Sequence, residues 1–336
     1  MIRQRNTLAR VLYALTLLST SIAQPSTPQR THISTRQATG NPIDPGGWWY
    51  ADPDAIKVGD TYWIYATLSI AFEDQKSFDA FSSPDLKTWT RHEGVYQASQ
   101  STWVEDSLWA PCVVKGLEDD KYYMYITANN PVADEGVVGI SVAVADSPAG
   151  PFLDVGDGPI VGDHVNGADP MDQQVFRDDD GSQYLIWGGS AVNILPLESD
   201  MTTLGVWETG STEALNITPD EGFGEGSYML KRNGVYYFMW SEGGYGTPDY
   251  RVAYAMSENL TGPFNRVGLV LSKEGSDVAD GPGHHSVIRE DVDGEEVYWI
   301  VYHRRYIGDT VADDRVLAVD RLYFNEDGTI KPVVMT

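Results

Sequence analysis

A strand pair joined by a tight turn recurs five times along the chain. The clearest copy spans residues 224–241, where Glu225 opens the first strand and Asn233-Gly234 forms the turn. Asn-Gly favours the positive φ angles of a two-residue hairpin, and the aromatic and β-branched run after it is typical of a strand. Similar turns lie at residues 58–61, 118–121, 179–182 and 292–295. They recur about every 53 to 61 residues, which indicates a repeat architecture.

Whole units repeat, and not only their hairpins. A hairpin cannot bury both of its faces alone, so five of them must pack against one another. Outer segments that resemble each other follow at residues 78–91, 141–152 and 251–264. We therefore predict an all-β, five-bladed β-propeller as a single domain over residues 41–336, with its active site in the central cavity. A hairpin through residues 325–328 should finish the fifth blade, and no long amphipathic helix is predicted.

Three carboxylates occupy equivalent places in this repeat. Counting back eight residues from the turns of the first, third and fourth units reaches Asp52, Asp172 and Glu225, with an alignment good to about one position. The fifth unit has His284-His285 there. Because the innermost strands of a propeller converge on one axis, these positions should face a common cavity. Three acids that meet at one point repel one another, so the arrangement predicts chemistry and not stability.

Two carboxylates across a cavity are what the cleavage of a glycosidic bond requires. One must be protonated to release the leaving oxygen, and the other must be ionised to activate water or attack the sugar. A third acid nearby can raise the pKa of the proton donor. Asp169, which precedes a proline as Asp52 does, is the runner-up to Asp172 for the middle position. No Gly-x-Ser-x-Gly, P-loop or His-Glu-x-x-His motif competes, and a sugar-binding propeller without catalysis is the alternative from another class.

Several other side chains are candidate contacts to a sugar. Trp109 and Trp49 could form apolar platforms for sugar faces, or belong to the core of the propeller. Arg315, near the last strands, could orient a carboxylate or a hydroxyl group. His284 could contact a hydroxyl group, coordinate a cation or bond within the core. One or two histidines do not make a metal site, so no cofactor is required and a structural calcium ion is left open.

The beginning of the chain has the pattern of a secretory signal. Residues 1–23 combine three arginines, an apolar run and a small-x-small cleavage site. The run is roughly a dozen residues, shorter than the about 20 that a membrane span needs. Residues 24–40 are predicted to be a flexible lead-in. We therefore expect a secreted, extracellular protein, with Asn216 and Asn259 as N-glycosylation acceptors.

The net charge restricts the partners. At −26 the chain repels phosphate backbones and anionic lipids, so neither nucleic acid nor a membrane is an expected partner. A neutral polysaccharide or oligosaccharide is compatible with this charge, and a monomer is expected. The single cysteine, Cys112, excludes an internal disulfide.

Five short motifs, taken in order, resemble glycoside hydrolase family 43, secreted fungal-type members included, over residues 41–336. They are Ala51-Asp52-Pro53, Trp109-Ala110-Pro111, Asp172-Gln173-Gln174-Val175-Phe176 with Asp178-Asp179-Asp180-Gly181, Glu225-Gly226, and Gly281-Pro282-Gly283-His284. Each motif alone is weak, but the five in order at propeller spacing are specific. Two departures are that Gln173 and Ser227 stand where many relatives have proline.

The resemblance implies a five-bladed propeller that hydrolyses glycosidic bonds with inversion at the anomeric carbon. Asp52 would be the general base, Glu225 the general acid, and Asp172 the residue that tunes and orients the acid. The carboxyl groups of base and acid would then lie about 6.5 to 9.5 Å apart. The implied activity is release of α-L-arabinofuranosyl units from arabinan or arabinoxylan, with β-D-xylosidase and endo-arabinanase as alternatives. In relatives the histidine that matches His284 lies near a channel ion or water, so calcium fits the resemblance without being required.

Overall fold

The computed structural model describes residues 40–43, 47–130 and 137–336. Within these residues nineteen strands form five antiparallel sheets, and the only helices are the short 3₁₀ turns η1 (Phe72–Asp74) and η2 (Ala98–Gln100). Neither has the length of a membrane span. The predicted signal of residues 1–23 and the lead-in as far as residue 39 lie outside the described residues.

Each sheet is one blade, and its strands follow one another in chain order. Blade 1 comprises β1 (Tyr50–Val58), β2 (Thr61–Leu68), β3 (Ser77–Ser83) and β4 (Thr90–Gln97). Blade 2 comprises β5 (Trp109–Lys115), β6 (Tyr122–Asn130), β7 (Val137–Ala145) and β8 (Leu153–Asp154). Blade 3 comprises β9 (Gln174–Arg177), β10 (Gln183–Trp187), β11 (Asn193–Leu197) and β12 (Leu215–Asn216). Blade 4 comprises β13 (Glu225–Arg232), β14 (Val235–Glu242), β15 (Arg251–Ser257) and β16 (Arg266–Leu271). Blade 5 comprises β17 (Asp280–Val292), β18 (Glu295–Arg305) and β19 (Val316–Leu322).

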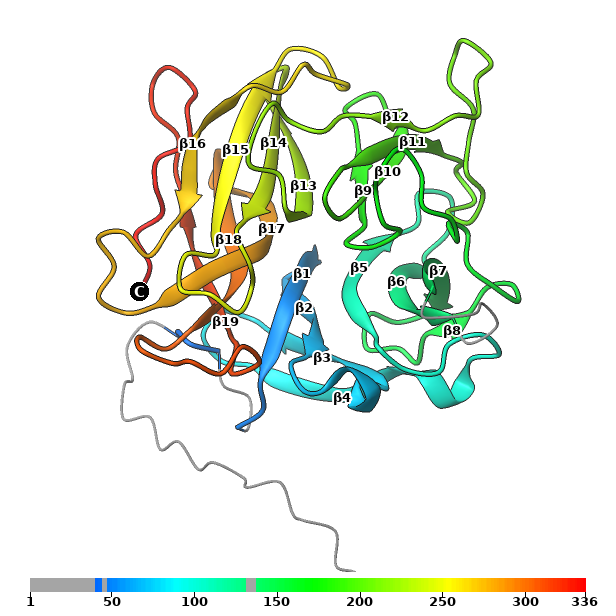
Figure 1. The fold of residues 1–336 in the computed structure, drawn as a ribbon, viewed down its shortest axis with the longest axis horizontal. Coiled ribbons are helices and arrows are strands. Elements are labelled where there is room, and N and C mark those ends of the chain that lie inside the picture. The colour runs from blue at the N-terminus through cyan, green and yellow to red at the C-terminus, as the bar shows by residue number, and fades with distance from the viewer. Residues whose placement is uncertain (1–39, 44–46, 131–136) are drawn as a thin grey trace, which may run out of the picture. The chain divides into compact units, whose positions relative to one another are not determined.

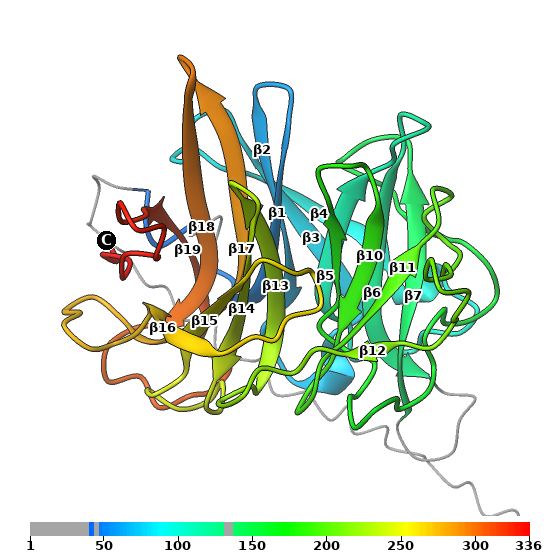
Figure 2. The same cartoon turned by 90° about the horizontal axis from the view of Figure 1, so that it is seen from above.

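The five blades stand around a common centre, as the repeat predicts. Figure 1 shows β1, β5, β9, β13 and β17 nearest that centre, and Figure 2 shows the same blades after a quarter turn. Each predicted hairpin joins the two innermost strands of one blade. In blade 4 the Asn233-Gly234 turn lies between Arg232 and Val235, which pair across the hairpin. The prediction of an all-β, five-bladed propeller is confirmed.

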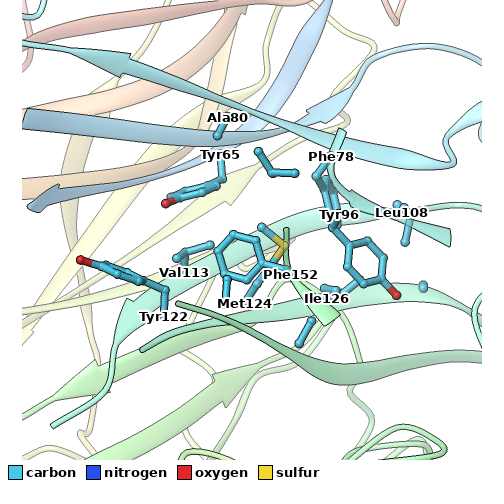
Figure 3. Close-up of a cluster of buried hydrophobic side chains, with 14 of the residues drawn as sticks. Tyr65, Phe78, Ala80, Tyr96, Leu108, Val113, Tyr122, Met124, Ile126 and Phe152 are labelled. Atoms are coloured by element: carbon cyan, nitrogen blue, oxygen red, sulfur yellow. The ribbon is translucent and has the colours of Figure 1, made fainter. Parts of the chain in front are cut away.

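Five apolar clusters hold the ring together, one between each pair of neighbouring blades. Figure 3 shows the cluster between blades 1 and 2, where Tyr65 and Phe78 of blade 1 meet Met124 and Ile126 of blade 2. All four side chains are fully buried. Burying a side chain of this size contributes about 1.5–3 kcal/mol, so blade-to-blade contact is a main source of stability.

Blade 5 is completed by the beginning of the described chain. The Ile43 N–H group donates to the Leu317 carbonyl at 2.8 Å, and the Asn41 side chain pairs with both the N–H and the carbonyl of Val319. The hairpin predicted over residues 315–334 is right for its first arm, because β19 is a strand of blade 5, and its turn at residues 325–328 forms. Its second arm is not a strand of the blade: only Phe324 and Ile330 bridge across the turn, and residues 41–43 lie at the free edge of β19.

Candidate active site

A single pocket brings the predicted site residues together. It encloses about 140 Å³ and is lined by Asp52, Phe72, Gln75, Trp109, Met171, Asp172, Glu225, Tyr245, His284 and Arg315. The three acids come from three different blades: β1 carries Asp52, Asp172 lies just before β9, and Glu225 opens β13. The pocket thus depends on the closed ring and on no single blade.

One residue on the inner side of each blade has a left-handed backbone. The φ angles are 50° at Asp52, 42° at Ala110, 53° at Asp172, 61° at Gly226 and 39° at His284. In blades 1, 2, 4 and 5 the pairing register of the innermost hairpin shifts at this residue, which is the signature of a β-bulge. Bulges re-aim side chains, and a non-glycine residue at positive φ stays there only when its surroundings hold it.

Neighbouring blades supply the groups that hold these residues. In four blades the N–H group at the bulge position donates to a side chain of the adjacent blade: Asp52 to His303 Nδ1, Ala110 to Thr67 Oγ1, Asp172 to Thr127 Oγ1 and His284 to Ser241 Oγ. Blade 3 lacks a side-chain acceptor at the equivalent position. The residue there is Gly188, whose N–H group donates to the Met171 carbonyl. The Gly226 N–H group instead donates to Asp172 Oδ2 at 3.0 Å, which fixes the Asp172 carboxyl group.

Asp52 lies among cationic groups. Arg315 Nη1 is 3.3 Å and His284 Nδ1 is 3.2 Å from Asp52 Oδ1. Burial alone would raise the pKa of Asp52, but Arg315 and His284 hold that pKa well below its usual range. Ser69 Oγ accepts a hydrogen bond from Arg315 Nε at 2.8 Å and so fixes the guanidinium group. Asp52 is therefore ionised across the neutral and mildly acidic pH range.

His303 holds the backbone of Asp52 and is a neutral ring. Its Nδ1 accepts the Asp52 N–H group at 3.1 Å, so that nitrogen carries no proton and the ring proton is on Nε2. Burial lowers the pKa of His303 to about 4, which agrees with a neutral imidazole. The 3.3 Å approach of Nδ1 to the Asp52 carboxylate is consequently not an ion pair.

His284 and Asp172 lie side by side, and both side chains are largely buried. Burial raises the pKa of Asp172 to about 7; His284 opposes this shift, and the charges of Glu225 and Asp52 add to it. Burial by itself would lower the pKa of His284, but Asp172 and Asp52 raise it to about 9. His284 Nδ1 is 3.7 Å from Asp172 Oδ2. A protonated imidazole thus bridges the two aspartates.

Glu225 lies one position away from the other two acids in the repeat. The bulge residue of blade 4 is Gly226, so Glu225 occupies the place of Trp109 in blade 2. Its side chain is partly exposed in the pocket, and the Tyr250 hydroxyl group donates to Glu225 Oε1 at 2.7 Å. The other carboxyl oxygen is left for a ligand.

Trp109 forms an apolar wall of the pocket. Its indole Nε1 donates to Gln75 Oε1 at 2.6 Å, and Gln75 Nε2 donates to the Leu68 and Ile70 carbonyls at 3.0 Å. The Phe72 ring packs edge-on against the Trp109 ring, with 5.4 Å between the ring centroids. The buried amide of Gln75 therefore sets the plane of the indole. The sequence predicted Trp109 but gave no signal for Gln75 or Phe72, which precede the second repeat.

The remaining predicted residues lie elsewhere. Asp169, the runner-up to Asp172, has a side chain that is 52% exposed; it pairs with His164 and does not line the pocket. Trp49 is partly buried against the Tyr306 ring and is likewise not a pocket residue. Asn216 and Asn259 are both exposed.

A smaller cavity of about 20 Å³ adjoins the pocket at Asp52, Asp172 and His284. Both ring nitrogens of His285 and the Ser227 hydroxyl group border it without a partner, and a cavity of this size holds one water. Calcium takes six to eight oxygen ligands. Among the described residues no three histidine, cysteine or acidic side chains are arranged to hold a metal. These side chains do not fit a directly ligated calcium ion, and calcium beside His284 stays a prediction.

We expect the protein to lose thermal stability between pH 6.5 and pH 9. The pKa of His284 is raised from 6.5 to about 9, so the protonated ring stabilises the fold fully below pH 6.5 and this contribution is lost as the pH rises through 9. The loss should be on the order of 3 kcal/mol, seen as a lower melting temperature at pH 9. His284→Gln should flatten this dependence, and an equally steep curve in that variant would contradict the assignment.

Comparisons with known proteins agree with this geometry. The description "Glycosyl hydrolases family 43" matches residues 39–330. A β-D-galactofuranosidase of Aspergillus niger is 41% identical over 323 residues, which cover 93% of this chain and 90% of that protein. A xylosidase/arabinosidase of Humicola insolens is 28% identical, over 83% of this chain and 95% of that protein. The solved structure of an α-L-arabinofuranosidase from Clostridium thermocellum has a TM-score of 0.66 and 31% identity, over 85% of this chain and 94% of that chain. The chain therefore belongs to glycosyl hydrolases family 43 and is a glycoside hydrolase.

Proposed function

We propose that the protein is an exo-acting, inverting glycosidase that releases terminal α-L-arabinofuranosyl units from arabinan or arabinoxylan. The observation that carries this proposal is the small axial pocket, which Asp52, Asp172 and Glu225 all line. Its volume of about 140 Å³ lies below the range of about 300–1,000 Å³ that drug-sized ligands occupy. A single terminal sugar ring suits such a pocket better than the interior of a chain.

Asp52 serves as the general base in this mechanism. It is ionised because Arg315 and His284 lower its pKa, and it is fixed through its own N–H group by His303. A water molecule between Asp52 and the anomeric carbon gives its proton to Asp52 as its oxygen attacks that carbon. The attack comes from the face opposite to the leaving oxygen, so the configuration inverts.

Glu225 serves as the general acid. Its proton passes to the glycosidic oxygen while the bond between that oxygen and the anomeric carbon breaks, and the carboxylate remains. Asp172 lies beside Glu225, and burial together with the Glu225 charge raises the pKa of Asp172, so Asp172 can stay neutral next to the acid. The Gly226 N–H group holds Asp172 in place for this role.

The choice of an arabinofuranosyl unit rests on the relatives and on the shape of the pocket. The relative from Clostridium thermocellum is an α-L-arabinofuranosidase, and Trp109 offers a flat apolar face for a sugar. A β-D-galactofuranosyl unit is the second candidate, because the Aspergillus niger relative is a β-D-galactofuranosidase. The two sugars share the configuration of the five-membered ring and differ by one hydroxymethyl group on the exocyclic carbon.

Hydrolysis of a matched set of 4-nitrophenyl glycosides tests the proposal. We expect kcat/KM for the α-L-arabinofuranoside to exceed that for the β-D-galactofuranoside and the β-D-xyloside by at least about tenfold, since the pocket must distinguish ring shape and one exocyclic group. A preference for the galactofuranoside would favour the second candidate, and a preference for the xyloside would contradict both. Activity on internal bonds of linear arabinan alone would indicate an endo-arabinanase. No hydrolysis at all would favour a sugar-binding propeller.

The stereochemical course is a separate readout. Proton NMR of the first product should show the β-anomer of arabinofuranose before mutarotation, because water attacks opposite the leaving oxygen. An α-anomer formed first would contradict the assignment of Asp52 as a base.

We also propose that the enzyme is secreted, glycosylated and monomeric. Residues 1–23 have the pattern of a signal sequence, and Asn216 and Asn259 are exposed sequon residues. Mass spectrometry of the secreted protein should give an N-terminus at Gln24 and a mass decrease on removal of N-glycans. Light scattering should give the mass of one chain.

A further inference from the structure

Tyr250 is a buried ring that the sequence motifs do not point to. It is fully buried at the end of the loop before β15, and its ring lies parallel to the His303 ring, with 5.6 Å between the centroids and 5° between the planes. Gly283, which pairs with His303 across β17 and β18, also lies against this ring, and an added Cβ there would lie 2.0 Å from Tyr250 Cε1. The ring is therefore packed on the imidazole and against a backbone that must lack a side chain.

The hydroxyl group of this ring reaches the proposed acid. It donates to Glu225 Oε1 at 2.7 Å, while the stacked His303 accepts the N–H group of Asp52. Burial and the neighbouring Glu225 charge raise the pKa of Tyr250 well above its usual value, so the phenol keeps its proton and stays a donor. One rigid pair of rings thus touches both the acid and the base.

We propose that Tyr250 is a positioning residue for proton donation by Glu225. By occupying Oε1, the phenol leaves Oε2 as the oxygen that carries the proton, and it fixes the rotamer that presents this proton to the glycosidic oxygen. This inference rests on the proposed function. It also explains Gly283 in the motif Gly281-Pro282-Gly283-His284, because any side chain there would displace the ring.

Tyr250→Phe separates positioning from general structural damage through the leaving group. A methyl or oligosaccharide leaving group needs a proton from Glu225, whereas 2,4-dinitrophenolate leaves without one. We expect the variant to lose about 10- to 100-fold in kcat on arabino-oligosaccharides, the worth of a hydrogen bond to the carboxylate that forms as Glu225 gives up its proton. On the 2,4-dinitrophenyl glycoside the loss should be at most about threefold, with KM unchanged.

Tyr302→Phe is the matched control. Tyr302 is also fully buried, and its hydroxyl group also donates to a carboxylate, Asp320 Oδ2, at 2.7 Å, but it lies outside the pocket. This variant should lower the melting temperature as much as Tyr250→Phe does and leave both activities unchanged. Gly283→Ala, which displaces the ring without removing the hydroxyl group, should reproduce the leaving-group dependence.

Three outcomes would overturn the inference. They are equal losses on both substrates, no loss on either, and a leaving-group dependence that appears in Glu225→Gln but not in Tyr250→Phe. In the last case the proposed acid stands and only the role of Tyr250 falls. A wild-type protein that hydrolyses neither substrate overturns the proposed function, and this inference with it.

Discussion

Replacing Asp52 with asparagine is expected to lower kcat by about 10³- to 10⁴-fold on every glycoside that the enzyme accepts. The amide can still accept hydrogen bonds from Arg315 and His284, so the pocket should keep its shape, but it cannot take a proton from water. Because the attacking water needs the base whatever the leaving group is, the loss should be the same for activated and natural substrates. Steady-state kinetics on both kinds of substrate measure it.

Asp54→Asn is the control for this variant. Asp54 lies on the same strand two residues further on, and burial raises its pKa to about 7 although the Val113 N–H group opposes the shift. Near pH 5 it is already mostly neutral, so the amide replaces it with little change in charge. Its kcat should stay within about threefold of the wild type. A similar loss in both variants would mean that Asp52 acts through folding and not as the base.

Replacing Glu225 with glutamine should lower kcat on arabino-oligosaccharides by at least about 10³-fold. Glutamine can keep the hydrogen bond from Tyr250, but it has no acidic proton to give to the leaving oxygen. On a 2,4-dinitrophenyl glycoside, whose leaving group needs no proton, the loss should shrink to about tenfold or less. This contrast distinguishes the acid from the base, because Asp52→Asn should show none.

Glu242→Gln is the control for Glu225→Gln, and it should lower stability without lowering activity. Glu242 is a buried glutamate at the end of β14, and it pairs with Arg251 and Arg266 instead of facing the pocket. Removing its charge should cost about 1.5–3 kcal/mol of stability, because two partly exposed guanidinium groups lose a buried partner, and leave kcat/KM unchanged at a temperature where the variant is folded. Glu225→Gln should instead keep the melting temperature within a few degrees. Loss of activity in both variants would contradict the assignment of Glu225.

The sequence was sufficient for the five blades because the signals for a hairpin are local. A turn and the aromatic run after it identify each inner strand pair, and the spacing between the turns counts the blades. The same count brought Asp52, Asp172 and Glu225 toward one axis, and all three line the pocket. Their catalytic roles remain predictions.

The sequence predicted less well which residue of each inner strand is the bulge residue. In blade 1 the counted residue, Asp60, is the second residue of its turn, whereas in blade 4 Asn233 is the first, since Arg232 pairs with Val235 there. The count therefore reached Glu225, one residue before the bulge at Gly226. A count from turns cannot show which residue takes the positive φ, because hydrogen bonds from the adjacent blade select it.

The sequence could not predict which side chains of different blades contact each other. Tyr250 and His303 belong to different blades and lie in no shared motif, so only the closed ring brings them together. Trp49 was predicted to be either a platform for a sugar or a core residue, and it packs against Tyr306 outside the pocket. The hairpin predicted to finish blade 5 supplies β19 but no further strand, and a segment from the other end of the described chain lies at the edge of β19.

The closure of blade 5 by residues 41–43 has a consequence for biosynthesis. Asn41 pairs with Val319, Asp320 and Thr336, so contacts near one end of the domain await residues that the ribosome adds about 280 positions later. Nascent blades can form their own hairpins early. Residues 41–43, however, stay unpaired until β19 has emerged from the ribosome. Contacts this distant in sequence slow folding, so the last step of assembly waits until β19 has left the ribosome.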